Sequence, residues 1–229
     1  MFKVHEIDGK IRSAYGMTVA DVTGTGHPDI LVGSTGISMI ALYEGPDFKK
    51  QVISEAHSGT IALSVHDVTG NGQKDIIAGS GFARRQRIPP EYLHWFQAPE
   101  SGDIWTQYFI DWVPYLHRVA TVDVNGEPLV FVATLQGLGR SLNDFDAPGA
   151  LWCYRIPKDP VNEPWEKRLI DGNLKLNHGL SVGDMDGDGR MDLLLGARDG
   201  VIWFEPPEGD GFTGEWKRWT ISERESSET

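Results

Sequence analysis

Segments in which large apolar residues alternate with small or polar ones recur four times along the chain. Period two is the side-chain period of a β-strand, so each segment predicts a strand with one buried face. The alternating positions are Tyr15, Met17 and Val19; Ile61, Leu63 and Val65; His117, Val119 and Thr121; and His178, Leu180 and Val182.

Three further segments follow each of these strands in a fixed order. The first is a short run that is apolar on both faces, as expected of a buried central strand, at 30–32, 76–78, 129–132 and 193–195. The second is another apolar strand, at 40–43, 93–96, 151–154 and 201–204. The third begins with an aromatic residue and ends in polar residues, at 48–54, 105–111, 165–171 and 216–222.

One aspartate marks the same point in every copy, directly after the first strand. These are Asp21, Asp67, Asp123 and Asp184, at separations of 46, 56 and 61 residues. Four strands per repeat, arranged radially, make a β-propeller blade. We therefore predict an all-β fold, a single domain over 1–229 with about four blades of four antiparallel strands, at about 9–54, 55–111, 112–171 and 172–222.

The amino-terminal segment 2–8 complicates this count, because it resembles the last strand of a preceding blade. The chain then has one outer strand too many for four blades. Three arrangements follow: a compact four-bladed ring, a slice of a larger ring with additional blades or domains, or half of a ring that a second copy completes. An array that did not close would leave apolar faces bare, which favours a homo-oligomer.

Charge and composition exclude several classes of partner. The chain has 229 residues and a formal net charge of -12, and binding to nucleic acid or to an anionic membrane needs clustered cations. No apolar stretch is long enough for membrane insertion, and the amino terminus has no signal peptide, so we expect a cytoplasmic protein or a secreted domain whose leader was removed. Cys153, the single cysteine, lies in an apolar run and is expected to be a buried, inert thiol.

The turn after the first strand of the fourth copy has the composition of a cation-binding loop. Carboxylates stand at alternate positions, and Gly187 and Gly189 allow the positive φ angles that curl the backbone. Ligation by oxygen alone suits calcium rather than zinc or copper. The expected ligands are Asp184, Asp186, Asp188, the carbonyl of Arg190, and Asp192.

The first and second copies have poorer versions of this loop. Each offers only two carboxylates, so weaker binding is expected, and the alternative is that the side chains merely cap the turn through backbone amides. In the third copy the turn is too short to surround an ion. The candidate ligands are Asp21, Thr23, Thr25 and Asp29 in the first copy and Asp67, Thr69, Asn71 and Asp75 in the second.

On these loops and the four-strand pattern, nearly the whole chain resembles the FG-GAP/VCBS repeat family. The fourth copy carries the most specific match, and the third is weak. The resemblance implies calcium-loop propeller blades like those of integrin α-subunits and of many bacterial and fungal sugar-acting proteins. It also implies that Ca²⁺ is structural, because it would join two strands of one blade without meeting a substrate.

The opposite edge of the blades should collect a different set of residues. The innermost strands begin there, at Tyr15, Ile61, His117 and His178, and two long inserts emerge there. The chain's cations thus sort to one side, which favours a carbohydrate or another anionic small ligand. Candidate ligand-binding residues are His57, Arg84, Arg85, Arg87, Tyr115, Arg140 and Lys175, and the candidate catalytic residues are Tyr15, His117, Arg118 and His178.

Histidine and tyrosine beside an arginine suit proton abstraction next to a carboxylate. The resemblance implies such chemistry, because related propellers occur in sugar lyases and in aldos-2-ulose dehydratase. Against it, a histidine at a strand start is often a structural hydrogen-bonding residue, an arginine loop is often only solvated, and two imidazoles can hold a transition metal.

Our prediction is a calcium-stabilised propeller that binds an acidic or oxidised sugar on the face opposite its calcium loops. The alternatives are a polysaccharide lyase or sugar dehydratase, or part of one, and a noncatalytic protein-interaction or assembly scaffold.

Overall fold

A computed structural model describes residues 2–82, 91–139 and 144–223, which form sixteen β-strands. Within those ranges no segment forms a helix long and apolar enough to cross a membrane. The strands are β1 (Ala14–Ala20), β2 (Asp29–Ser34), β3 (Ile40–Glu44), β4 (Lys49–Ser54), β5 (Ala62–His66), β6 (Asp75–Ser80), β7 (Tyr92–Gln97), β8 (Thr106–Trp112), β9 (Leu116–Val124), β10 (Glu127–Thr134), β11 (Gly149–Arg155), β12 (Glu166–Leu174), β13 (Gly179–Gly183), β14 (Asp192–Ala197), β15 (Gly200–Glu205) and β16 (Lys217–Glu223).

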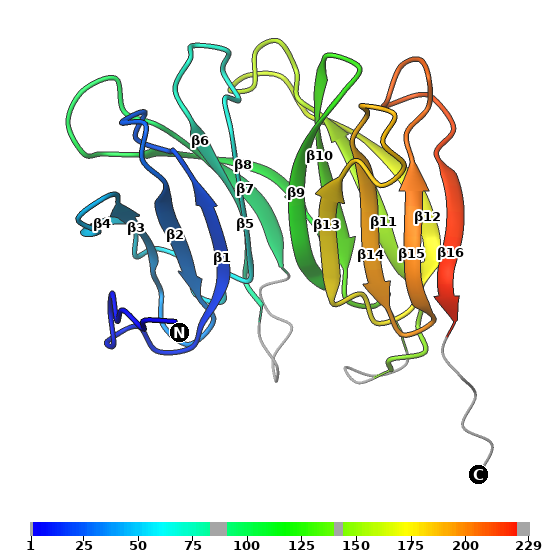
Figure 1. The fold of residues 1–229 in the computed structure, drawn as a ribbon, viewed down its shortest axis with the longest axis horizontal. Helices are drawn as coiled ribbons and strands as arrows, with labels where there is room; N and C mark the ends of the chain where they lie inside the picture. Colours follow the sequence, from blue (N-terminus) through cyan, green and yellow to red (C-terminus); the bar gives the residue numbers. More distant parts are fainter. Residues whose placement is uncertain (1, 83–90, 140–143, 224–229) are drawn as a thin grey trace.

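The strands form four antiparallel sheets of four, each in chain order from β1–β4 to β13–β16. Figure 1 shows the sheets as successive blades, with β1, β5, β9 and β13 innermost. The all-β, four-bladed propeller prediction is therefore confirmed. It follows from the pattern because each second and third strand is apolar on both faces and can pack between two neighbouring sheets.

Apolar side chains fill the space between successive sheets. Leu31 and Leu42 of the first sheet meet Ile76 and Phe96 of the second, and all four are buried. The corresponding layers join the second sheet to the third around Trp95, and the third to the fourth around residues that include Phe131 and Phe204. The inner strands approach closely: a Cβ on Gly16 of β1 would lie 3.0 Å from the backbone of Ile61, which precedes β5.

The first and fourth sheets leave apolar side chains on their outer faces. The main contacts between inner strands join β1 to β5, β5 to β9 and β9 to β13; in the described part of the chain none joins β1 to β13. Met17 and Val19 of β1 are 66% and 58% exposed, and Trp219 of β16 is 49% exposed. These are the faces on which a further blade or a second copy would pack, and that closure of the ring stays a prediction.

The prediction of a strand-like segment at 2–8 is wrong. These residues form no strand, and Phe2 and Val4 are exposed. Asp8 instead fixes the segment to the first sheet, accepting hydrogen bonds from the Tyr43 hydroxyl at 2.6 Å and from Lys50 Nζ at 2.9 Å. The alternating pattern was insufficient, because a strand also needs a free sheet edge with which to pair.

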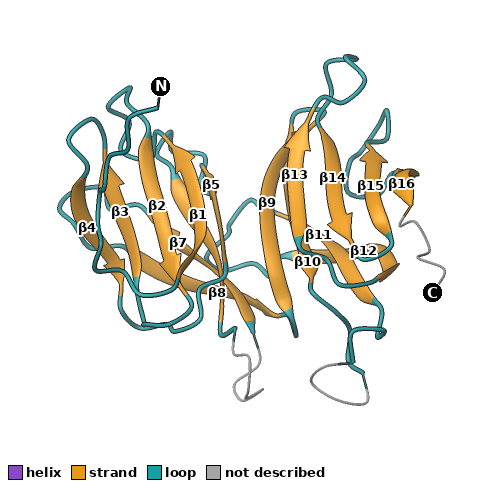
Figure 2. Cartoon of the chain, turned by 60° about the horizontal axis from the view of Figure 1, so that its bottom comes forward, coloured by secondary structure: helices purple, strands orange, loops and turns teal. Residues whose placement is uncertain are grey.

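The two ends of the inner strands carry different chemistry. Figure 1 shows the β1–β2, β5–β6, β9–β10 and β13–β14 loops along the upper edge of the blades, and the starts of the inner strands along the lower edge (Figure 2 gives a second view). We call these the loop edge and the start edge. The aspartate loops and the candidate histidines therefore lie at opposite edges of the propeller, as the strand order requires.

Candidate functional site

The residues at the starts of the inner strands come together at the start edge. Tyr15 and His117 both sit at β-bulges, where the ladders β1–β2 and β9–β10 shift register. A bulge adds an unpaired residue and re-aims its side chain, and bulges are common beside functional sites. The rings of Tyr15 and His117 lie 6.0 Å apart, and those of His117 and His178 lie 4.9 Å apart in an edge-on arrangement.

His117 is the most unusual member of this group. It is only 1% exposed, yet neither Nδ1 nor Nε2 has a hydrogen-bond partner among the residues that the structure describes. The ring lies among those of Tyr15, Phe82 and His178. Buried polar atoms are rarely left unpaired, because the lost hydrogen bonds to water cost about 1–3 kcal/mol each. An external polar group would offset that cost here.

Arg118 ties three blades together at the same point. Its Nε donates to the carbonyl oxygen of His178 at 2.7 Å, one terminal nitrogen donates to the carbonyl of His117 at 3.0 Å, and the other reaches the Tyr15 hydroxyl at 3.4 Å. The guanidinium carbon also lies 5.2 Å from the centre of the Tyr15 ring. Three of the five N–H donors are used in this way, so two remain for a ligand.

Electrostatics keep both imidazoles neutral. Burial lowers the pKa of His117 to about 3, with further lowering from the Arg118 guanidinium and from His178. Burial and then Arg118 also lower the pKa of His178. At neutral pH the site therefore has one fixed positive charge, on Arg118, beside two uncharged rings that can each donate one hydrogen bond and accept another. We call Tyr15, Phe82, His117, Arg118 and His178 the channel-mouth cluster.

The cluster opens on the central channel of the propeller. A cavity of about 400 Å³ runs between the four inner strands, with Tyr15 and Arg118 among its lining residues. Farther along the channel, the hydroxyls of Ser64 and Thr121 are 2.9 Å apart and share a hydrogen bond. The space is of the size that encloses small ligands.

The candidate ligand-binding residues are only partly gathered at this cluster. Tyr115 is buried with a positive φ of 60°, and its backbone contacts Glu91 and Leu135. Lys175 is half-buried, and its carbonyl accepts a hydrogen bond from the amide of Arg198. The remaining candidates, apart from His57, lie outside the described residues: Arg84, Arg85, Arg87 and Arg140.

His57 belongs to a second group that the sequence did not predict. Its Nε2 lies 2.5 Å from Gln107 Oε1, and its Nδ1 shares a hydrogen bond with the Tyr92 hydroxyl. Gln107 also bonds the buried His94, whose other ring nitrogen bonds Ser80 at 2.9 Å. Burial, with a smaller contribution from His57, lowers the pKa of His94 to about 3. The available signal was a histidine inside the otherwise apolar segment 93–96.

At the loop edge, the fourth aspartate loop gathers three exposed carboxylates. Ligand atoms of Asp184, Asp186 and Asp188 all lie within 4.8 Å of one another. Gly187 and Gly189 have φ of 81° and 87°, and the Asp184 carboxylate accepts hydrogen bonds from both of their amides. Asp188 is paired with the Arg190 guanidinium, which lowers the pKa of that carboxyl. The oxygen-rich set fits a calcium ion, with free lone pairs on each carboxylate.

The corresponding loops of the first and second sheets use their carboxylates on the backbone. Asp29 is fully buried, and it accepts hydrogen bonds from the amides of Val22 and Thr23, from the Thr23 hydroxyl, and from the amide of Gly45. In the second loop, Asp75 takes the same role.

The remaining side chains of these loops show the same habit. Asp21 and Asp67 each accept two amides of their own loop. Thr25 contacts the Thr23 hydroxyl at 3.4 Å, and the Asn71 side chain accepts from the amide of Gln73. Thr69 differs, because its hydroxyl is buried without a partner in the described part of the chain.

One substitution sets the fourth loop apart from the first two. Asp29 and Asp75 each bond the amide that follows their third strand, that of Gly45 or Ala98. The corresponding residue after β15 is Pro206, which has no N–H to donate. Asp192, buried like its counterparts, bonds the amide of Met185 through one oxygen and lacks this second backbone donor. The fourth loop is therefore the one in which a cation has most to add.

Comparison with known proteins supplies little beyond the fold. No family model matches the chain, so the FG-GAP/VCBS resemblance stays a prediction. No curated protein matches it either. Among solved structures, the chain is similar to an aldose sugar dehydrogenase from Streptomyces coelicolor in its PQQ-bound form, with 14% identity and a TM-score of 0.49 over 95% of this chain and 71% of that one. At that level of similarity we base no argument about activity on the likeness.

Proposed function

We propose that the protein binds an acidic or oxidised sugar at the channel-mouth cluster. The observation that carries this proposal is His117, a buried imidazole whose two nitrogens have no partner in the described part of the molecule. A polyhydroxylated ligand brings both donors and acceptors for such a ring.

The charge of the cluster favours an acidic ligand. The unused N–H groups of Arg118 suit a carboxylate, because charge-assisted hydrogen bonds are the strongest that a side chain makes. The Tyr15 ring, which is exposed, can stack against a sugar ring. Neutral imidazoles favour binding over base catalysis, because a group whose pKa is about 3 accepts a proton poorly at pH 7.

The replacement of His117 by phenylalanine tests the proposal. His117→Phe keeps a ring in the same space and removes both unpaired nitrogens, so we expect stability to be unchanged or raised. Affinity for trigalacturonate should fall roughly thirtyfold, or about 2 kcal/mol, through the lost hydrogen bonds. Calorimetric titration measures the affinity, and thermal melting measures the stability.

Two further variants serve as controls. Arg118→Gln should weaken trigalacturonate binding at least as much, whereas Arg218→Gln, which removes an arginine paired with Asp171 on the outer strand β16, should leave it unchanged. A His117→Phe protein that melts at a lower temperature and still binds the ligand normally would show that the imidazole is only structural.

Catalysis is the second candidate, favoured by the exposure of His178. Its ring lies beside that of His117, and its carbonyl holds Arg118. In a β-elimination, His178 would take the proton next to the carboxylate, the bond to the neighbouring oxygen would break, and the Tyr15 hydroxyl would protonate that oxygen. The unsaturated product absorbs in the ultraviolet. Binding without a rise in absorbance supports the binding function alone.

We further propose that Ca²⁺ occupies the fourth aspartate loop. Asp184, Asp186, Asp188 and Asp192 would supply carboxylate oxygens, and Arg190 its carbonyl. Calcium should therefore raise the melting temperature, with a stabilisation of about 2.7 kcal/mol at a hundred times the dissociation constant.

Asp186→Ala should remove most of this calcium effect, because it deletes one of three clustered carboxylates. Asp67→Ala, in the second loop, is the matched control and should leave most of the effect in place. Melting curves with calcium and with chelator provide the measurement, and a melt that ignores both additions would refute the calcium proposal.

A further inference from the structure

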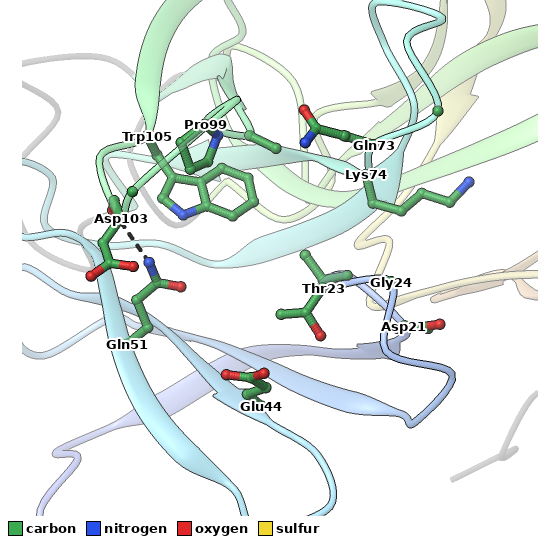
Figure 3. A pocket seen from close by; sticks show the side chains of 14 residues that line it. Asp21, Thr23, Gly24, Glu44, Gln51, Gln73, Lys74, Pro99, Asp103 and Trp105 are labelled. Atoms are coloured by element: carbon green, nitrogen blue, oxygen red, sulfur yellow. Dashed lines mark hydrogen bonds between the residues drawn. The ribbon is translucent and has the colours of Figure 1, made fainter.

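We infer that a second sugar site, for neutral rather than acidic sugars, lies at the loop edge between the first and second sheets. A cavity of about 510 Å³ opens there, and it is the larger of the two cavities described in this article. Its walls come from the β1–β2 loop, the β5–β6 loop and the β7–β8 loop, together with Glu44 and Gln51 of the first sheet (Figure 3). This inference does not depend on the function proposed for the channel mouth.

Trp105 forms the apolar wall of the cavity. It is half-buried, and it packs on the apolar layer between the first and second sheets while lining the cavity. The flat face of an indole is a common platform for the C–H groups of a sugar ring, because its negative π-face meets their positive edge. Figure 3 shows the ring at one side of the cavity, opposite the Lys74 side.

The equivalent tryptophans of the third and fourth sheets are used differently. Trp165 donates its indole N–H to the carbonyl of Pro160, and Trp216 donates to the carbonyl of Gly211. Both rings take part in the apolar layers between sheets. The indole N–H of Trp105 has no acceptor among the described residues, although the same turn precedes it. This tryptophan alone of the three combines an unpaired donor with a place on a cavity wall.

Polar side chains face Trp105 across the cavity at hydrogen-bonding positions. Gln51 Nε2 donates to the carbonyl of Asp103 at 3.2 Å, which links the outer strand of the first sheet to the loop of the second. The Gln51 side-chain oxygen and the Glu44 carboxylate remain available as acceptors for sugar hydroxyls. An aromatic face with a few convergent polar groups is the usual composition of a ligand pocket.

The charges of the lining select against an acidic sugar. Asp21, Glu44 and Asp103 contribute negative charge, and Lys74 is the one lysine or arginine among the lining residues. The channel mouth has the opposite character, because Arg118 is its charged group. We therefore assign the loop-edge cavity to a neutral sugar unit, of one or two residues, within a longer oligosaccharide.

Titration of the whole protein with neutral oligosaccharides tests this inference. The probes are cellotetraose, xylotetraose, mannotetraose and maltotetraose, each followed by calorimetry, with trigalacturonate as the acidic counterpart. We expect at least one neutral probe to bind. Trp105→Ala should raise its dissociation constant at least tenfold, and Trp105→Phe, which keeps an aromatic face, should raise it less.

Two control variants make the outcome specific. Trp219→Ala removes a tryptophan that is 49% exposed on the fourth sheet, and it should not change neutral-sugar binding. His117→Phe should not change it either. Circular dichroism establishes that Trp105→Phe is folded. Three results would overturn the inference: no binding of any neutral probe, equal losses in Trp105→Ala and Trp219→Ala, or loss of neutral-sugar binding in His117→Phe.

Discussion

Asp29→Ala is expected to lower the free energy of unfolding by about 4 kcal/mol, because it leaves several buried donors without an acceptor. The carboxylate is fully buried and receives the amides of Val22, Thr23 and Gly45 together with the Thr23 hydroxyl. It thereby joins the β1–β2 loop to the end of β3. Urea unfolding followed by tryptophan fluorescence measures the loss.

A neighbouring aspartate provides the control. Asp21 lies in the same loop and accepts the amides of Thr25 and Gly26, but it is exposed, so water can replace it. Asp21→Ala should cost about 1 kcal/mol. Similar losses in the two variants would contradict the view that Asp29 is a buried structural anchor.

Acidification should destabilise the protein through His94 and His117. The pKa of each is lowered to about 3 in the folded protein, whereas the unfolded chain titrates near 6.5. Below pH 6.5 the unfolded state therefore binds protons that the folded state does not. Stability is fully present above that pH and is lost as the pH falls toward 3, by about 1.4 kcal/mol per unit for each histidine.

At pH 5 this amounts to a loss of about 2 kcal/mol for each of the two groups. Urea midpoints at pH 7 and pH 5 measure it. His94→Gln and His117→Phe should each flatten the dependence, while His5→Gln, which alters an exposed histidine of the amino-terminal segment, should not. Identical pH profiles in the wild type and in both buried-site variants would refute this assignment.

The strand pattern was predictable because it depends on local alternation. Apolar residues at 76–78 and 193–195 lie in the buried strands β6 and β14, and the prediction of four four-stranded blades is confirmed. The exposed segment 2–8 marks the limit of this reasoning, because a strand needs a partner edge that its own residues do not encode.

The site was less accessible to sequence reasoning, because its distinctive features arise between sheets. Equivalent positions in the repeats predicted that Tyr15, His117 and His178 would lie near one another. The bulges that aim Tyr15 and His117, and the unpaired nitrogens of His117, depend on register and packing across blades. The cavity beside Trp105 also requires two adjacent sheets, and nothing in its local sequence separates it from Trp165.

A crystal structure of the protein with trigalacturonate tests the central claim most directly. The account predicts a uronate at the start edge, with its carboxylate on Arg118 and a hydroxyl within hydrogen-bond distance of a ring nitrogen of His117. A ligand bound elsewhere, with the nitrogens of His117 satisfied by the protein's own groups, would contradict it.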